Sequence, residues 1–195
     1  MSEHAFSAPE RRAVYRVIAE RRDMRRFVPN SEIPEDVLAR LLQAAHAAPS
    51  VGLMQPWRFI RITNADVRQR IHRIVDEERF RIAEALGPRG DEFLQLKVEG
   101  ILECAELFVV ALADNRATHV FGRRTLPPQM DLASVSCALQ NLWLAARAEG
   151  LGMVGSRSSI RVRSPTRSGC PPTPSPLRSS ASVRYPRSRT DLRSR

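Results

Sequence analysis

The sequence changes character after Gly155, and this change confines any folded core to the residues before it. The last forty residues, 156–195, contain eleven serines, ten arginines and six prolines, with no periodic apolar pattern. Such a segment buries too little apolar surface to offset the conformational entropy lost on ordering. We therefore expect a flexible N-terminus over 1–9, a folded domain over 10–155 and a disordered tail over 156–195.

The same tail carries nearly all of the excess positive charge. The 195 residues have a net charge of +10, which taken alone favours a nucleic-acid partner. The tail accounts for +9 of it, whereas residues 1–155 hold 21 basic and 20 acidic residues. The domain is thus close to neutral, and we do not expect it to bind nucleic acid.

Two origins of the tail stay open. One is an Arg/Ser-rich tail that binds nucleic acid. The other is a reading frame different from the one in which the domain was selected. We favour the shifted frame, because shifted codons in GC-rich DNA readily give Arg, Ser and Pro.

Within the domain, apolar periodicity predicts an α+β fold. Apolar residues recur at helical spacing in five segments, and two further segments are typical of strands. The run from Leu107 to Leu112 is continuously apolar, which predicts a buried central strand. Asn64 and Gly87 suit the start and the end of a helix. The expected helices cover 10–22, 34–48, 64–86, 91–105 and 131–149, and the expected strands cover 57–62 and 107–112.

A polar loop joins the second helix to the first strand. Pro49 ends the helix because it cannot continue the backbone hydrogen bonds, and Pro56 ends the loop. Between them, Ser50, Gly52 and Gln55 leave backbone and short polar groups free to meet a ligand. Spacing alone favours an ordinary connection between helix and strand, with a ligand-binding loop as the alternative.

Charged residues are concentrated after the first helix, in the run Arg21-Arg22-Asp23-Met24-Arg25-Arg26-Phe27. One interpretation is a solvated charged turn. The other is an anion site, because guanidinium groups match phosphate oxygens in a bidentate geometry. In that case Asp23 could act as a hydrogen-bond acceptor or a proton shuttle toward a reacting group.

Other residue types exclude some classes of site. Cys104, Cys137 and Cys170 are odd in number and have no CxxC spacing, so neither a disulfide framework nor a metal site is expected. We see no secretory segment and no apolar span of membrane length, which favours the cytoplasm and no membrane partner. The loop over 114–129 is long enough for a lid or a subunit contact, and His119 within it is either structural or catalytic.

Three groups of residues resemble the nitroreductase-like flavoproteins, and more closely the 5,6-dimethylbenzimidazole synthases of the BluB type. The resemblance rests on the arginine run over 21–25, on the loop and strand over 48–59, and on the segment over 130–152, whose Trp143 is expected in the core. The segment that begins at His119 strengthens the assignment to the subfamily. The match covers roughly residues 10 to 153.

The resemblance implies a homodimer with a central mixed sheet flanked by helices and with FMN at the subunit interface. In this family reduced FMN is both cofactor and substrate, because the enzyme fragments it with dioxygen to give 5,6-dimethylbenzimidazole, the lower ligand of cobalamin. NAD(P)H is then an indirect source of electrons, and Asp23 is the implied catalytic acid and base. The implied cofactor-binding residues are Arg21, Arg22, Asp23, Met24, Arg25 and Ser50.

After Gly152 the sequence departs from the family. Its members continue with a Gly-Trp-Val-Ser-like strand whose serine assists catalysis, whereas this chain reads Met153-Val154-Gly155-Ser156. We do not transfer that role to Ser156. We expect a sheet that is incomplete at the C-terminus and a protein whose activity is impaired. A generic NAD(P)H-dependent nitroreductase or flavin reductase, and an inactive remnant, stay open as alternatives.

Overall fold

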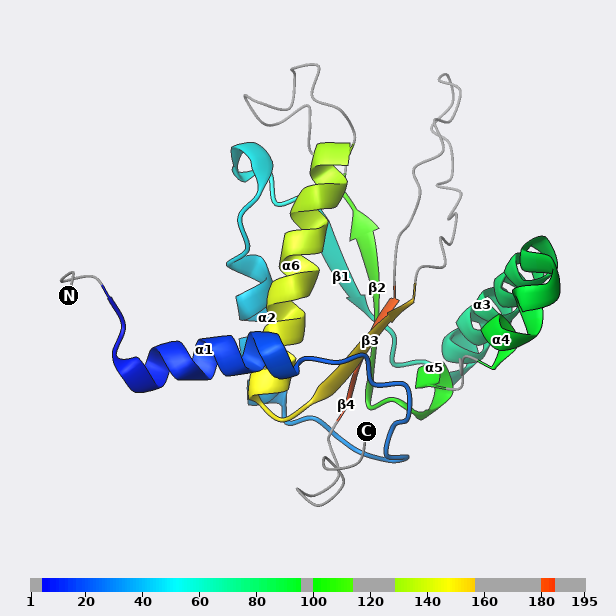
Figure 1. Cartoon of the computed structure of the whole chain (residues 1–195), viewed down its shortest axis with the longest axis horizontal. Coiled ribbons are helices and arrows are strands. Elements are labelled where there is room, and N and C mark those ends of the chain that lie inside the picture. Colours follow the sequence, from blue (N-terminus) through cyan, green and yellow to red (C-terminus); the bar gives the residue numbers. More distant parts are fainter. Residues whose placement is uncertain (1–4, 96–99, 114–128, 157–179, 185–195) are drawn as a thin grey trace.

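The computed structural model describes residues 5–95, 100–113, 129–156 and 180–184 (Figure 1). Helices dominate this part of the chain and the strands form one small sheet, so the α+β class is confirmed. The helices are α1 (Ala8–Glu20), α2 (Glu35–His46), α3 (Ala65–Leu86), α4 (Gly90–Leu94), α5 (Gly100–Glu103) and α6 (Gln129–Ala148), with 3₁₀ turns η1 (Val51–Leu53) and η2 (Gly87–Arg89). The strands are β1 (Trp57–Arg61), β2 (Glu106–Leu112), β3 (Gly152–Ser156) and β4 (Ser180–Arg184).

The strands are ordered β1-β2-β4-β3, and each neighbouring pair is antiparallel. This arrangement differs from the mixed sheet that the resemblance implies. β2 and β3 run in the same direction, but β4 lies between them and pairs with both, so no parallel ladder forms among the described strands. A parallel contact exists only as the isolated bridge between Asp23 and Met153 in this part of the chain.

β4 lies in the segment for which the sequence predicts no ordered element. Its Ser182 pairs with Leu107 of β2 on one side and with Val154 of β3 on the other. These pairings supply partners to backbone groups that would otherwise line two open strand edges. Periodicity could not reveal a five-residue strand whose partners are distant in sequence. The rest of the predicted tail, 157–179 and 185–195, lies outside the described residues, so its disorder stays a prediction.

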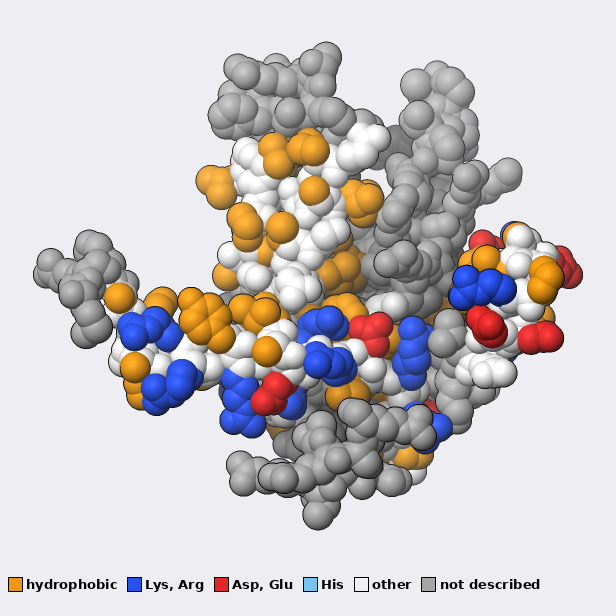
Figure 2. Space-filling model, viewed as in Figure 1, with side chains coloured by type: hydrophobic (Ala, Val, Ile, Leu, Met, Phe, Trp, Pro, Cys, Tyr) orange, Lys and Arg blue, Asp and Glu red, His pale blue; other side chains and the backbone are white. Residues whose placement is uncertain are grey.

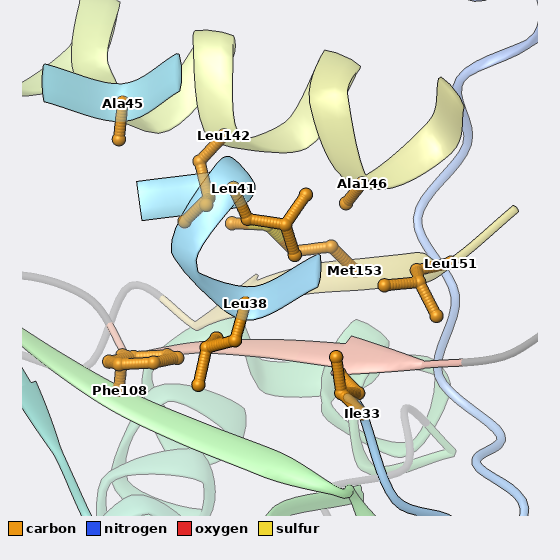
Figure 3. Close-up of a cluster of buried hydrophobic side chains, with 9 residues drawn as sticks. All are labelled: Ile33, Leu38, Leu41, Ala45, Phe108, Leu142, Ala146, Leu151 and Met153. Atoms are coloured by element: carbon orange, nitrogen blue, oxygen red, sulfur yellow. The ribbon is translucent and has the colours of Figure 1, made fainter. Parts of the chain in front are cut away.

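The main core lies where α2 and α6 cover one face of the sheet (Figure 3). Leu41 of α2 and Leu142 of α6 are fully buried, and they meet Met153 of β3. Burying a side chain of this size contributes about 1.5–3 kcal/mol, so the apolar stripes of the two predicted helices account for this layer. The complete cluster is Ile33, Leu38, Leu41, Ala45, Phe108, Leu142, Ala146, Leu151 and Met153.

A second cluster covers the opposite face of the sheet. Leu107 of β2 is buried there against Ile71 and Val75 of α3, whereas its neighbour Phe108 belongs to the main core. Successive side chains of a strand point to opposite faces, so a strand covered on both sides is apolar throughout. The prediction that residues 107–112 form a buried central strand is therefore confirmed.

The helices beside this second cluster differ in how well they were predicted. α3 begins and ends as expected, since the Asn64 side chain accepts hydrogen bonds from two backbone N–H groups of the first turn and Gly87 takes a φ of 57°. Of the single helix expected over 91–105, the structure describes α4 and α5, and residues 96–99 between them lie outside the described residues. Gly100 of α5 is in close contact with Phe27, since a Cβ at this position would lie 2.5 Å from the Phe27 ring.

α1 differs from the other long helices because none of its residues is buried (Figures 1 and 2). Val14, Tyr15 and Ile18 are each more than half exposed, at 55%, 68% and 52%. The helix begins inside the segment predicted to be flexible, where the Ser7 backbone N–H donates to the Glu10 carboxylate at 2.8 Å. None of the helices in the described part of the chain combines the length and apolar character needed to cross a membrane.

Candidate functional site

The arginine run follows α1 and is held against β3. Asp23 forms a backbone bridge with Met153, and the Met24 N–H donates to the Met153 carbonyl oxygen at 3.1 Å. Phe27, at the end of the run, is buried in the second core cluster. The backbone is thus anchored in the middle and at the end, while Arg25 projects as an exposed side chain.

The charged side chains of the run have different partners. The Nη1 of Arg21 donates to Oδ1 of Asp23 at 3.2 Å, and these side chains are 31% and 49% exposed. Arg22 instead donates to the backbone oxygens of Ala19 and Arg21, each at 2.7 Å. The Arg22 guanidinium group makes no ion pair with Asp23, although the two residues are neighbours in the sequence. Carbonyl oxygens at the C-terminal end of a helix lack partners and attract a nearby guanidinium group.

The Trp143 ring of α6 packs against the guanidinium group of Arg21. The Cζ of Arg21 lies 4.8 Å from the centre of the Trp143 ring, a cation–π geometry. The indole Nε1 is buried and has no hydrogen-bond partner within the described residues. The sequence predicted Trp143 simply as a core residue, but the structure makes it the link between α6 and the arginine run.

An ion pair next to Trp143 fixes the end of α1 on α6. Arg147, one helical turn after Trp143, lies 2.7 Å from the carboxylate of Glu20. A hydrogen bond from Arg16, with a smaller contribution from Arg147, lowers the pKa of Glu20 below its usual value. The carboxylate is therefore ionised at neutral pH, and the arginine run starts from a defined position.

The Ser50 loop forms the second candidate region. The Ser50 Oγ accepts a hydrogen bond from the Gln55 N–H at 3.1 Å, and the Val51 N–H donates to the Ser134 Oγ of α6 at 3.2 Å. Leu53 and Gln55 have φ values of 53° and 43°, in the left-handed region that residues other than glycine rarely adopt. Such backbone strain is typical of functional sites.

The two regions lie toward opposite ends of α6 (Figure 1). Ser134 contacts the Ser50 loop and Trp143 contacts Arg21, and these two α6 residues are separated by about 13 Å along the helix axis. The structure therefore brings Arg21, Asp23 and Trp143 together but does not bring Ser50 to them within one chain.

Some predicted features fall outside these two regions. The part of the long loop over 114–128, with His119, lies outside the described residues. Among the residues that are described, no group of three or more His, Cys, Asp or Glu side chains is placed to hold a metal ion. Ser134 was not predicted at all, although a small polar residue on the buried stripe of a helix signals a hydrogen-bonding role.

Comparisons with known proteins identify the family of this chain. A family model described as Nitroreductase family matches residues 18–159. The chain is 43% identical over 138 residues to 5,6-dimethylbenzimidazole synthase of Rhodospirillum rubrum, covering 68% of this chain and 63% of that protein. It is 35% identical over 150 residues to 5,6-dimethylbenzimidazole synthase of Rhodobacter capsulatus, covering 76% of this chain and 72% of that protein. The chain thus spans about two thirds of the length of these relatives.

The fold is also similar to that of solved structures. A crystal structure of oxidised iodotyrosine deiodinase bound to FMN and 3-iodo-L-tyrosine superposes with a TM-score of 0.62. At 22% sequence identity, over 93% of this chain and 97% of that one, the likeness is one of fold. Since the family match spans most of the sequence and the fold agrees with it, this chain belongs to the nitroreductase family.

Proposed function

We propose that this chain is the FMN-binding part of a flavin-dependent oxidoreductase, a 5,6-dimethylbenzimidazole synthase. It would convert reduced FMN and dioxygen to 5,6-dimethylbenzimidazole for the lower ligand of cobalamin. The observation that carries the proposal is the accessible Asp23 carboxylate, held by Arg21 within an arginine run that lies inside the family match over residues 18–159.

The arginine run fits the phosphate of FMN. Figure 2 shows arginine side chains gathered along α1 and just beyond its end. Arg22 and Arg25 are exposed, so their guanidinium groups are accessible to an anion. We assign phosphate binding to Arg21, Arg22 and Arg25.

Asp23 is placed to move a proton. Reduced FMN supplies the electrons and the carbon skeleton of the product when it is bound. Arg21 engages Oδ1 of Asp23 and thereby orients the carboxylate, which leaves Oδ2 to accept a proton. The backbone bridge to Met153 anchors the backbone of Asp23 beside β3.

A homodimer with FMN between the subunits is part of the proposal. The arginine run and the Ser50 loop lie too far apart along α6 to form one compact pocket in a single chain. A second copy could bring its Ser50 loop to the run and cover apolar side chains that one chain leaves exposed. These side chains are Val14, Tyr15 and Ile18 of α1 and Leu53 of η1.

In this proposal NAD(P)H is an indirect donor of the electrons that reduce FMN. We place the reaction in the cytoplasm, where reduced nicotinamide is available. Neither point depends on the geometry of Asp23, and the electron source is tested by supplying chemically reduced FMN with and without NADPH.

The first experiment measures flavin retention. Purified protein is incubated with FMN, separated from free flavin by gel filtration and examined by its visible spectrum. Retained flavin supports the proposal. A soluble protein that retains none would instead be the inactive remnant, since the departure after Gly152 would then have removed the site.

The second experiment compares wild type with Asp23→Asn after photoreduction of bound FMN and exposure to air. We expect Asp23→Asn to retain FMN but to form 5,6-dimethylbenzimidazole at least about 100-fold more slowly, because general acid–base catalysis contributes roughly 10²–10⁴. Asp91→Asn, on exposed α4, is the matched control. Steady NADPH oxidation with a nitroaromatic compound and no loss of FMN would select the generic reductase instead.

A further inference from the structure

The Ser50 loop needs an external support to keep its shape. Three of its residues, Gly52, Leu53 and Gln55, have positive φ values of 59°, 53° and 43°. A backbone of this kind persists only where its surroundings hold it, since Leu53 and Gln55 pay a steric cost that glycine does not. Leu53 cannot be that support within one chain, because it is 79% exposed.

Part of the support comes from the loop itself. The Leu53 N–H donates to the Ser50 carbonyl oxygen at 3.1 Å, and the Met54 N–H donates to the Val51 carbonyl oxygen at 3.2 Å. Together with the Gln55 N–H on Ser50 Oγ, these bonds define a compact turn. They do not define where the turn sits on the rest of the molecule.

Ser134 connects this turn to α6. Its side chain is buried, with 4% of the residue exposed, and its Oγ lies 3.2 Å from the Val51 nitrogen. The same hydroxyl donates to the Met130 carbonyl oxygen at 2.9 Å, so its one proton is committed and a lone pair faces the Val51 N–H. One hydroxyl group thereby joins the loop to the first turns of α6.

We propose that Ser134 is a positioning residue, which fixes the Ser50 loop for flavin binding without touching the flavin itself. The inference rests on the proposed function, because it takes Ser50 as the flavin contact. It goes beyond that function by assigning a role on α6 to a residue outside the loop. Without the hydroxyl, the Val51 N–H loses its partner, and the strained turn is held on the molecule only by its remaining contacts, among them the buried Met54.

The test uses two variants of the same shape. Ser134→Thr keeps the hydroxyl, whereas Ser134→Val replaces it with a methyl group, so any clash from the added carbon affects both. The matched control is Ser136→Ala, because Ser136 also donates to a carbonyl oxygen one turn earlier, that of Leu132 at 2.9 Å, but is exposed and not bonded to the loop.

Two measurements are made on the intact chain: hydrogen exchange of the Val51 amide without FMN, and the FMN dissociation constant. In Ser134→Val we expect the Val51 amide to exchange about ten-fold faster, and the FMN dissociation constant to be about ten-fold higher, than in Ser134→Thr. Ser136→Ala should match wild type in both measurements. Equal Val51 exchange in the Thr and Val variants would overturn the inference. If wild type binds no FMN, the proposed function fails, and the exchange measurement still decides whether Ser134 holds the loop.

Discussion

At the scale of single residues, Arg21 is held from two sides, by the Asp23 carboxylate and by the Trp143 ring. A cation–π contact of a partly exposed arginine contributes about 0.5–1 kcal/mol. We therefore expect Trp143→Leu to weaken FMN binding about two- to five-fold, because the guanidinium group is no longer pre-oriented toward the phosphate. Trp143→Phe keeps a ring face and should have the smaller effect. Titration of FMN fluorescence measures both.

The control for this prediction is Gln140→Ala, an exposed position on the same helix. If Trp143→Leu bound FMN as tightly as wild type, the ring would have no part in orienting Arg21. If Trp143→Leu does weaken binding, its thermal unfolding midpoint separates the loss of the arginine contact from a general loss of packing around α6.

The residue types of the site could be predicted from the sequence, but their contacts could not. The arginine run pointed to an anion site as one interpretation, because guanidinium groups match phosphate oxygens, and the family resemblance added the role of Asp23. The direction taken by Arg22 depends on the Ala19 carbonyl oxygen, which becomes available only because α1 ends there. Ser134 was missed because a single serine in an apolar helix is compatible with many roles until its partner Val51 is known.

At the scale of elements, long helices and the central strand were predictable because each has its own apolar pattern. α6 and β2 follow their predicted segments closely, and both lie in the core. The close contact between Gly100 and Phe27 was not predictable from periodicity, because it joins residues that are far apart in the sequence. β4 was not predictable either, since its pairing partners are backbone groups of distant strands.

The position of β4 leads to a prediction about the tail. Val183 lies between Glu106 of β2 and Met153 of β3, so a proline there removes a donor from the interior of the sheet. We expect Val183→Pro to lower the free energy of unfolding by roughly 2 kcal/mol or more. Denaturant unfolding followed by circular dichroism measures it. Ser168→Pro, in the part of the tail for which disorder is predicted, is the control.

An unchanged stability in Val183→Pro would mean that the sheet does not depend on β4. The tail would then be dispensable, as the sequence alone suggests for residues 156–195. A loss of stability in Val183→Pro with none in Ser168→Pro would instead show that five residues of the tail complete the sheet. This result would also explain how the domain tolerates its departure from the family after Gly152.

At the scale of the whole molecule, periodicity identified an apolar stripe on α1 but not what covers it. Val14 and Ile18 belong to that stripe and are exposed in one chain. A helical pattern shows that a face is to be buried, and only the fold shows that the chain itself does not bury it. The same limit applies to Leu53, whose exposure follows from the left-handed turn at η1.

If two copies share each site, inactive variants should complement one another. Arg21→Glu removes the phosphate site and Ser50→Glu blocks the flavin side, so each alone should bind no FMN. When both are co-expressed, half of randomly formed dimers are mixed, and each mixed dimer has one site built from two unaltered halves. We therefore expect about a quarter of the wild-type FMN capacity, measured by absorbance after gel filtration.

The matched control pairs Arg21→Glu with Arg25→Glu, which alter the same half of the site. Every site in such a mixture carries one damaged run, so no capacity should return. Recovery with Ser50→Glu but not with Arg25→Glu requires that the run and the loop of one site come from different chains. If neither mixture recovers FMN binding, the arginine run and the Ser50 loop of each site belong to the same chain. Arg21 and Ser50, which contact α6 at separate positions, would then have to approach each other through a change in the fold.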